Sequence, residues 1–384
     1  MKLKTLLFAL LFNYTLVVFS QNPVKLSSGQ FAFIEGPVWD RSDKIYFSDI
    51  IDRKVYTYSV TNNTFAVAFN IVSPARTNGL MFDSNLNLIV CEFGDGLITR
   101  RNTSGTILST YATGILNAND LCLDKKEGIY ASSPNSGKVY YISPDPSRTL
   151  TAIDETISSP NGVLVSTDGK KLFVNDSDGY TIYKYDINTT TGLVSNRVAF
   201  ATLTDHDNTE VKSLADGMAI DKNGNLYVTA KKSIQVFNAL GTLTNTFNFT
   251  ENPTNCTFGG AGLGTLYVTT PKDLYKIVLT DVTGFQHPFD LPIANLSVND
   301  LDKVSFKMFP NPITNHEINV IVGDAKISEV LLYNNFGQKV DTCNFKRTNK
   351  AIQIKFNPSL KNNVYILSIK TSEGSIINEK VILQ

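Results

Sequence analysis

The sequence is poor in the residues that build metal or nucleophile sites from nitrogen and sulfur. Its 384 residues include only four cysteines, three histidines and one tryptophan. It has no Cys-x-x-Cys or His-Glu-x-x-His zinc motif and no Gly-x-Ser-x-Gly elbow. Glycine loops of the phosphate-binding or dinucleotide-binding type are absent as well. These absences argue against a zinc protease, a serine hydrolase and a nucleotide-dependent enzyme.

An excess of charge of either sign is also lacking. Thirty-five basic residues balance thirty-five acidic ones, so the composition favours neither nucleic acid nor an anionic membrane as a partner. Hydrophobic residues make up 42% of the chain, which is enough for a sizeable core. Beyond residue 20, no segment is long and apolar enough to span a bilayer. We therefore expect no nucleic-acid partner and no membrane span.

The first twenty residues differ from the rest of the chain. Lys2 and Lys4 precede an apolar run at residues 6–19, a pattern typical of a signal peptide. A membrane helix needs about 20 apolar residues, and Asn13 interrupts this shorter run. The sequence therefore predicts a signal peptide at residues 1–20 and a protein that is secreted or held at the cell surface.

The four cysteines are predicted to be unpaired. Cys91, Cys122 and Cys256 lie within apolar, strand-like runs, where a free cysteine behaves as a small buried hydrophobic residue. An exported protein could oxidise a pair that included Cys343, but the spacing of the cysteines does not identify one.

A short β-rich run recurs six times along the chain. The runs begin at Ile45, Leu88, Ile129, Leu172, Leu226 and Leu266. Each follows turn-forming residues and precedes a second strand-like segment, and no helical periodicity separates them. Six such units predict an all-β fold, a six-bladed β-propeller at residues 21–290. Residues 24–33 precede the first repeat and are expected to add the strand that closes the ring.

An oxygen-bearing side chain precedes each of the first five runs by ten residues, except that the fourth repeat has one extra residue between the side chain and the run. The positions are Glu35, Asn78, Asn119, Asn161 and Asp216, and the sixth offset reaches Cys256, beside Asn255. Because the first strands of a propeller are innermost, equivalent positions meet at one mouth of its channel. A single Asn-Gly or Asp-Gly pair is more typical of a turn. Five in register predict one divalent metal ion, Ca²⁺ before Zn²⁺ or Mg²⁺, because carboxylates and amides suit hard cations.

At these positions the sequence resembles the gluconolactonase and senescence-marker-protein family. The matching segments are Glu35-Gly36-Pro37-Val38-Trp39, Asn119-Asp120, Ser159-Pro160-Asn161-Gly162, Ala215-Asp216-Gly217 and Pro253-Thr254-Asn255-Cys256-Thr257-Phe258-Gly259-Gly260. The resemblance covers about residues 30–280. It implies a six-bladed propeller that uses a divalent ion to hydrolyse sugar lactones or related esters.

The resemblance also implies roles for individual residues. Glu35, Asn161 and Asp216 would be the protein ligands of the metal, with Asp216 as the general acid/base as well. Asn119 would bind the lactone substrate or join the outer coordination of the metal. We add Asn78 and Asp120 as further residues on the substrate side. Asp120 is also the reserve candidate for the base.

The chain departs from the family pattern at two places. Asn117-Ala118 stand where some members carry a basic substrate-contacting residue, and Phe93 stands where many carry histidine. The substrate therefore stays open. A lactone hydrolase is the leading hypothesis, and a non-catalytic binding propeller or a hydrolase of another ester or phosphoester are the alternatives.

Three histidines and one loop lie outside this pattern. The interval between the fourth and fifth runs is longer than the others, and its extra residues fall at 205–208. These residues are more typical of a plain surface loop than of a lid over the site. His206, His287 and His316 do not fall in the aligned column. We predict them to be surface or loop residues.

The C-terminal part follows a different pattern. Residues 291–304 are predicted to be a linker and residues 305–384 a separate module that opens with Phe309-Pro310-Asn311-Pro312. Five strand-like runs in about 80 residues predict a small C-terminal β-sandwich. The segment resembles the sorting domain that Bacteroidetes use for type IX secretion, which implies that export machinery is a partner. A permanent accessory β domain is the alternative.

Overall fold

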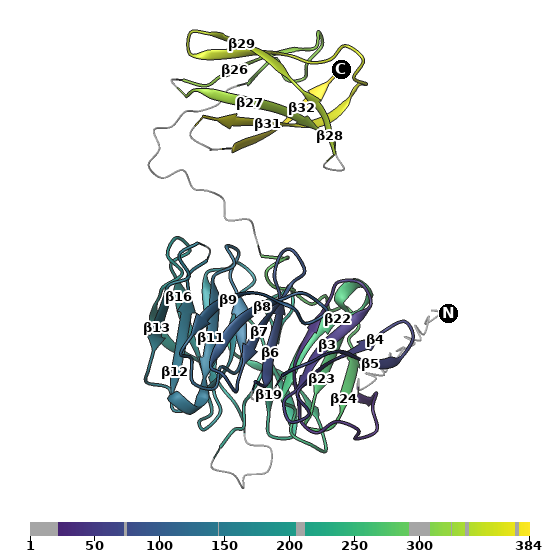
Figure 1. Cartoon of the computed structure of the whole chain (residues 1–384), viewed down its shortest axis with the longest axis vertical. Coiled ribbons are helices and arrows are strands. Elements are labelled where there is room, and N and C mark those ends of the chain that lie inside the picture. The colour runs from purple at the N-terminus through teal and green to yellow at the C-terminus, as the bar shows by residue number, and fades with distance from the viewer. Residues whose placement is uncertain are drawn as a thin grey trace, which may run out of the picture. The chain divides into compact units, whose positions relative to one another are not determined.

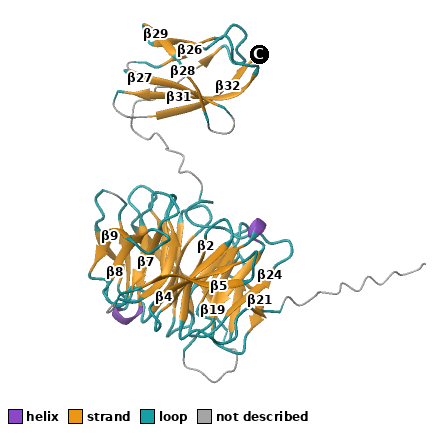
Figure 2. Ribbon diagram, turned by 45° about the vertical axis from the view of Figure 1, so that its right-hand side comes forward, coloured by secondary structure: helices purple, strands orange, loops and turns teal. Residues whose placement is uncertain are grey.

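The computed structural model describes residues 22–72, 75–144, 146–204, 212–291, 308–323, 325–334, 338–372 and 376–384. The predicted signal peptide, the loop at 205–208 and nearly all of the predicted linker lie outside these residues. The described chain contains strands and two short 3₁₀ helices, η1 (Pro134–Ser136) and η2 (Ala261–Leu263), but no α-helix. The all-β prediction is confirmed, as Figure 2 shows. None of the helices in the described part could cross a membrane.

The chain divides into two compact units, residues 1–295 and 296–384. The described part of the first unit contains six four-stranded antiparallel sheets (Figure 1). The first three contain β2 (Ile34–Trp39), β3 (Lys44–Asp49), β4 (Lys54–Ser59) and β5 (Thr64–Asn70); β6 (Thr77–Phe82), β7 (Leu88–Glu92), β8 (Leu97–Arg101) and β9 (Ile107–Thr113); and β10 (Leu121–Leu123), β11 (Ile129–Ser133), β12 (Lys138–Ile142) and β13 (Leu150–Asp154).

The other three sheets have the same meander order. They contain β14 (Pro160–Val165), β15 (Lys171–Asp176), β16 (Thr181–Ile187) and β17 (Val194–Thr202); β18 (Met218–Ile220), β19 (Leu226–Ala230), β20 (Ser233–Phe237) and β21 (Leu243–Asn248); and β22 (Asn255–Gly259), β23 (Thr265–Thr269), β24 (Leu274–Val278) and β1 (Val24–Lys25). The six repeated runs of the sequence form the second strand of each sheet. Apart from β1, the outer strands were not individually predicted; they are less buried than the inner strands.

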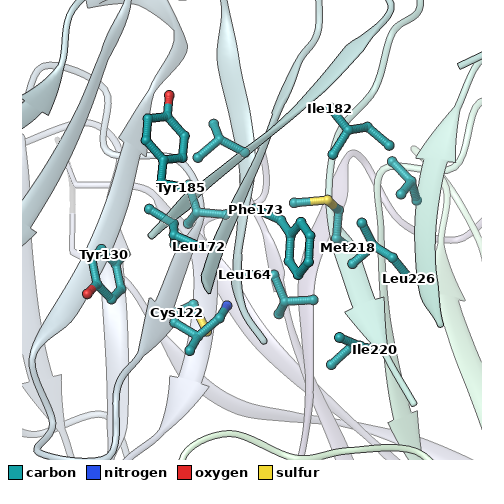
Figure 3. Close-up of a cluster of buried hydrophobic side chains, with 14 of the residues drawn as sticks. Cys122, Tyr130, Leu164, Leu172, Phe173, Ile182, Tyr185, Met218, Ile220 and Leu226 are labelled. Carbon is teal, nitrogen blue, oxygen red and sulfur yellow. The ribbon is translucent and has the colours of Figure 1, made fainter. Parts of the chain in front are cut away.

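The first strands of the six sheets form a closed ring. β2 contacts β6, and contacts continue through β10, β14, β18 and β22 back to β2. Neighbouring sheets share cores of apolar side chains. One core joins Leu172 of β15 to Met218 and Leu226 of the next sheet (Figure 3). Because both faces of the inner strands pack against neighbours, these strands read as nearly continuous apolar runs.

The ring is closed by the N-terminal end of the described chain. Val24 and Lys25 pair with Lys276 and Tyr275 of β24, so the prediction that this segment completes the last sheet is confirmed. Asp273 anchors the segment, because its carboxylate accepts bonds from Lys25, Ser27 and the amide of Gly29. Although burial opposes ionisation, these bonds hold the pKa of Asp273 below its usual range.

Residues 283–291 cross the end of the ring where the first strands finish. The amide of Phe285 donates to Ile220 O, Gln286 Nε2 donates to Trp39 O over 2.6 Å, and His287 Nε2 lies 2.7 Å from Val165 O. These three carbonyls belong to the last residues of β18, β2 and β14. The segment is called the crossing segment below.

His287 lies in a loop, which confirms the prediction of a surface or loop residue. Its side chain is buried. Burial lowers its pKa to about 4, so the imidazole is neutral at physiological pH. All four cysteines are buried and free, in agreement with the prediction.

The second unit has two four-stranded antiparallel sheets that share one hydrophobic core. In sheet order they contain β25 (Met308–Phe309), β26 (Glu317–Ile321), β30 (Ala351–Lys355) and β29 (Asn344–Thr348); and β28 (Lys339–Thr342), β27 (Ile327–Tyr333), β31 (Asn363–Thr371) and β32 (Ile376–Leu383). The five predicted runs correspond to β26, β27, β30, β31 and β32, whereas β25, β28 and β29 were missed.

Candidate metal centre

Six polar side chains occupy equivalent places where the first strands begin. They are Glu35, Asn78, Asn119, Asn161, Asp216 and Asn255. The structure corrects the sixth position, where counting along the sequence reached Cys256. Asn255 pairs with Thr269 on the second strand just as Glu35 pairs with Ser48. Since all six lie at the strand starts, they share the end of the ring opposite the crossing segment.

Glycine follows four of these six residues for a steric reason. A Cβ on Gly36 would lie 2.5 Å from Asn78 O, and a Cβ on Gly162 would lie 2.2 Å from Asp216 O. Each glycine therefore lets the next first strand approach closely. Gly36 and Gly162 lie within strands, so in these repeats the glycine serves packing between sheets rather than the turn that such pairs usually signal.

Replacing Gly162 by alanine is expected to lower the free energy of unfolding by about 1–3 kcal/mol, the usual cost of overpacking. The clash is with the Asp216 carbonyl, which cannot swing away as a side chain could. Denaturant unfolding in metal-free buffer measures the effect. Gly264→Ala is the control, because its Cβ would meet nothing closer than 3.6 Å. Equal stability of the two variants would contradict this account of the packing.

Four oxygens of this six-residue ring are buried without a hydrogen-bond partner in the described part of the chain. They are the Oδ1 atoms of Asn78, Asn119, Asn161 and Asp216. A buried acceptor without a donor is costly, and native proteins rarely leave several in one place. A hard cation satisfies such oxygens, because Ca²⁺ accepts six to eight carboxylate, amide and water oxygens.

Three carboxylates lie close enough to affect one another. Burial raises the pKa of Glu35 well above its usual range, and the nearby Asp216 and Asp120 raise it further. The pKa of Asp216 is likewise raised by burial and by Asp120. Burial raises the pKa of Asp120 to about 7. The site therefore concentrates more negative charge than it can neutralise from within.

Amide groups hold two of these carboxylates. Asn255 Nδ2 lies 3.0 and 3.3 Å from the two carboxylate oxygens of Glu35, and the Asn161 side chain opposes the rise in the pKa of Asp216. Asp120 accepts a bond from the amide of Val163 over 3.3 Å. The structure thus brings the predicted metal and acid/base residues, Glu35, Asn161 and Asp216, into one charged group with Asp120.

The donor set suits a cation that accepts oxygen ligands alone. Among the described residues, no three histidine, cysteine, aspartate or glutamate side chains are placed to share one ion. A cation here would therefore depend on the asparagine oxygens as well as on carboxylates. The orphaned oxygens and the mutually repelling carboxylates both fit such an ion.

The residues at the family departures also meet at this end of the ring. Asn117 Nδ2 donates to Phe93 O over 3.2 Å, and Asn117 Oδ1 accepts from Asn135 over 2.9 Å. Asn117 is therefore held by neighbouring loops, and it presents no charge two residues before Asn119.

Both units of the chain are similar to known proteins. A model of the SMP-30/gluconolactonase/LRE-like region matches residues 33–272. A model of the secretion system C-terminal sorting domain matches residues 307–384. A pentonolactonase of Haloferax volcanii is 26% identical over 248 residues, 62% of this chain and 80% of that protein. A gluconolactonase of Zymomonas mobilis is 25% identical over 296 residues, 66% of this chain and 81% of that protein.

Solved structures resemble the first unit in fold. A gluconolactonase of Xanthomonas campestris matches with a TM-score of 0.58 and 25% identity, covering 68% of this chain and 89% of that one. The calcium-binding protein regucalcin of Agrobacterium tumefaciens has the same TM-score at 16% identity, covering 68% of this chain and 95% of that one. The second likeness concerns the fold alone.

Proposed function

Because the chain belongs to the SMP-30/gluconolactonase/LRE-like family and carries a secretion sorting domain, we propose that it is an exported, divalent-metal-dependent hydrolase of sugar lactones. The observation that carries the proposal is the group of buried oxygens without donors beside three carboxylates. Lactonases among the similar proteins support the reaction class. Ca²⁺ is the first choice of ion, because all the donors are oxygens.

The architecture is part of the same proposal. We take the six sheets as the blades of a six-bladed β-propeller at residues 21–290, and the two sheets of the second unit as a β-sandwich at residues 305–384. Residues 1–20 would be removed as a signal peptide, and 291–304 would link the domains. Type IX secretion machinery is the partner that the sorting domain favours.

Individual residues receive roles from their surroundings. Glu35, Asn161 and Asp216 would hold the cation, which when bound supplies a positive charge to polarise the lactone carbonyl. Asp216 would also accept the proton of the attacking water, since its Oδ1 has no donor among the residues that the structure describes. General base catalysis of this kind contributes about 10²–10⁴-fold.

The substrate side of the site is assigned to the remaining residues. Asn119 and Asn78 would orient the lactone through their free Oδ1 atoms. Asp120, whose pKa of about 7 suits proton transfer at neutral pH, is the reserve base.

The test is acid release from a panel of sugar lactones by the purified protein. Turnover should disappear with a chelator and return when Ca²⁺, Zn²⁺ or Mg²⁺ is restored, and the three additions rank the ions. Hydrolysis of other esters or phosphoesters, with no lactone turned over, would move the activity to that class. Tight metal binding without turnover of any of these would identify a binding propeller instead.

A further inference from the structure

Asn255 is the one member of the six-residue ring whose position the sequence pattern did not identify. It opens β22, and only 5% of its surface is exposed. Its side chain lies between β18 and β2, because Gly217 packs against its amide and Glu35 receives its hydrogen bonds.

The orientation of the Asn255 amide is fixed by its chemistry. The backbone amide of Cys256 donates to Asn255 Oδ1 over 2.7 Å, so the oxygen end faces its own strand. Both N–H groups are then free for acceptors on the axis. They reach the two carboxylate oxygens of Glu35, at 3.0 and 3.3 Å. One neutral amide thus fixes a carboxylate that belongs to a different sheet.

The space around Asn255 is filled. A Cβ on Gly217 would lie 1.8 Å from Asn255 Cγ, so only glycine at that position leaves room for the amide. Thr269 Oγ1 accepts the backbone amide of Asn255 over 3.1 Å and fixes the start of the strand. The amide therefore has little freedom to turn away from the Glu35 carboxylate.

We propose that Asn255 is a positioning residue for the cation site. By donating to both carboxylate oxygens of Glu35, it holds this carboxylate at a fixed place beside the like-charged Asp216 and Asp120 and so raises the affinity for a divalent cation. Residues that orient a metal ligand through a hydrogen bond typically change metal affinity by about 10–100-fold. This inference rests on the proposed function, namely that the ring binds a cation.

The experiment measures Ca²⁺ binding by calorimetry on the purified protein. Asn255→Ala removes both donors and is expected to raise the Kd for Ca²⁺ about 10–100-fold. Asn255→Ser fits the same space and retains one donor, so its Kd should fall between those of the alanine variant and wild type. Unfolding temperatures without metal are recorded for each protein to check folding.

A matched control separates positioning from simple loss of a buried amide. Gln235 is also buried, but among the described residues its amide bonds only to the backbone of Thr204, over 2.8 and 2.9 Å. Gln235→Ala should lower the unfolding temperature and leave the Kd for Ca²⁺ unchanged.

The outcomes distinguish this inference from the proposed function. Folded Asn255 variants that bind Ca²⁺ within twofold of a metal-binding, lactone-hydrolysing wild type would overturn the positioning role alone. A wild type that binds no divalent cation would overturn both. If the Gln235 variant lost as much affinity for Ca²⁺ as the Asn255 variants, Asn255 would have only a structural role.

Discussion

Replacement of Asp216 by asparagine is expected to lower kcat/KM for lactone hydrolysis by about 10²–10⁴-fold. Asparagine has the shape of aspartate, so the packing against Gly162 should survive. The variant loses the carboxylate that we assign to both the cation and the proton. Steady-state kinetics in saturating Ca²⁺ measure the loss, and saturation ensures that weaker metal binding does not account for it.

Asp221→Asn provides the matched control for this substitution. Asp221 follows β18 in the same sheet and is fully buried, but its carboxylate caps a turn by accepting bonds from Asn223 and Asn225. The control should lose stability and retain kcat/KM. If Asp216→Asn kept more than about a tenth of wild-type kcat/KM, the loss would be well short of the expected 10²–10⁴-fold. The acid/base role would then pass to Asp120.

The metal-free protein is expected to become less stable as the pH rises from 6.5 to 8.5. Burial raises the pKa of Glu35, Asp120 and Asp216, with Asp120 at about 7. The folded state therefore keeps protons that the unfolded chain has already lost at pH 6.5. Stability that is present at low pH is lost as the pH rises through the folded pKa values, by up to about 1.4 kcal/mol per pH unit for each group.

The pH window is chosen to avoid opposing titrations. The pKa of His287 is lowered to about 4, so its contribution changes only between that value and its ordinary pKa, below the window. The depressed pKa of Asp273 acts at still lower pH. Calorimetric unfolding with a chelator should give the lower unfolding temperature at pH 8.5, and Ca²⁺ should remove most of the difference.

Glu35→Gln tests the origin of this pH dependence. The variant replaces one titrating group with a neutral side chain of the same length, so its metal-free stability should change less between the two pH values. A metal-free wild type that is more stable at pH 8.5 would show that the carboxylates do not crowd one another as described.

The sequence identified the members of the six-residue ring wherever the spacing between the polar residue and the repeated run was regular. Glu35, Asn78, Asn119, Asn161 and Asp216 stand out because turn residues keep their distance to the next strand nearly constant. Asn255 was missed because its hairpin is one residue longer, so that Asn255 lies one residue farther from its partner Thr269 than Glu35 lies from Ser48. The available signal was the segment that carries the family resemblance around Asn255. The tight contact of Gly217 with the Asn255 amide depends on a neighbouring sheet and cannot be read from local sequence.

The crossing segment could not be predicted for a related reason. Gln286 and His287 have no periodic apolar pattern, and their partners are carbonyls of strands more than 100 residues away in sequence. Such contacts follow from the assembled ring. The cavity of about 50 Å³ between Asn255 and His287 likewise depends on the residues that several sheets contribute.

The pairing of β1 with β24 has a consequence for the order of folding. Lys25 and Asp273 are 248 residues apart, so the last sheet cannot be completed until almost the whole first unit has been synthesised. Contacts between such distant residues make folding slow. Until then the outer edge of β24 has no neighbouring strand, and the last sheet of the ring is incomplete.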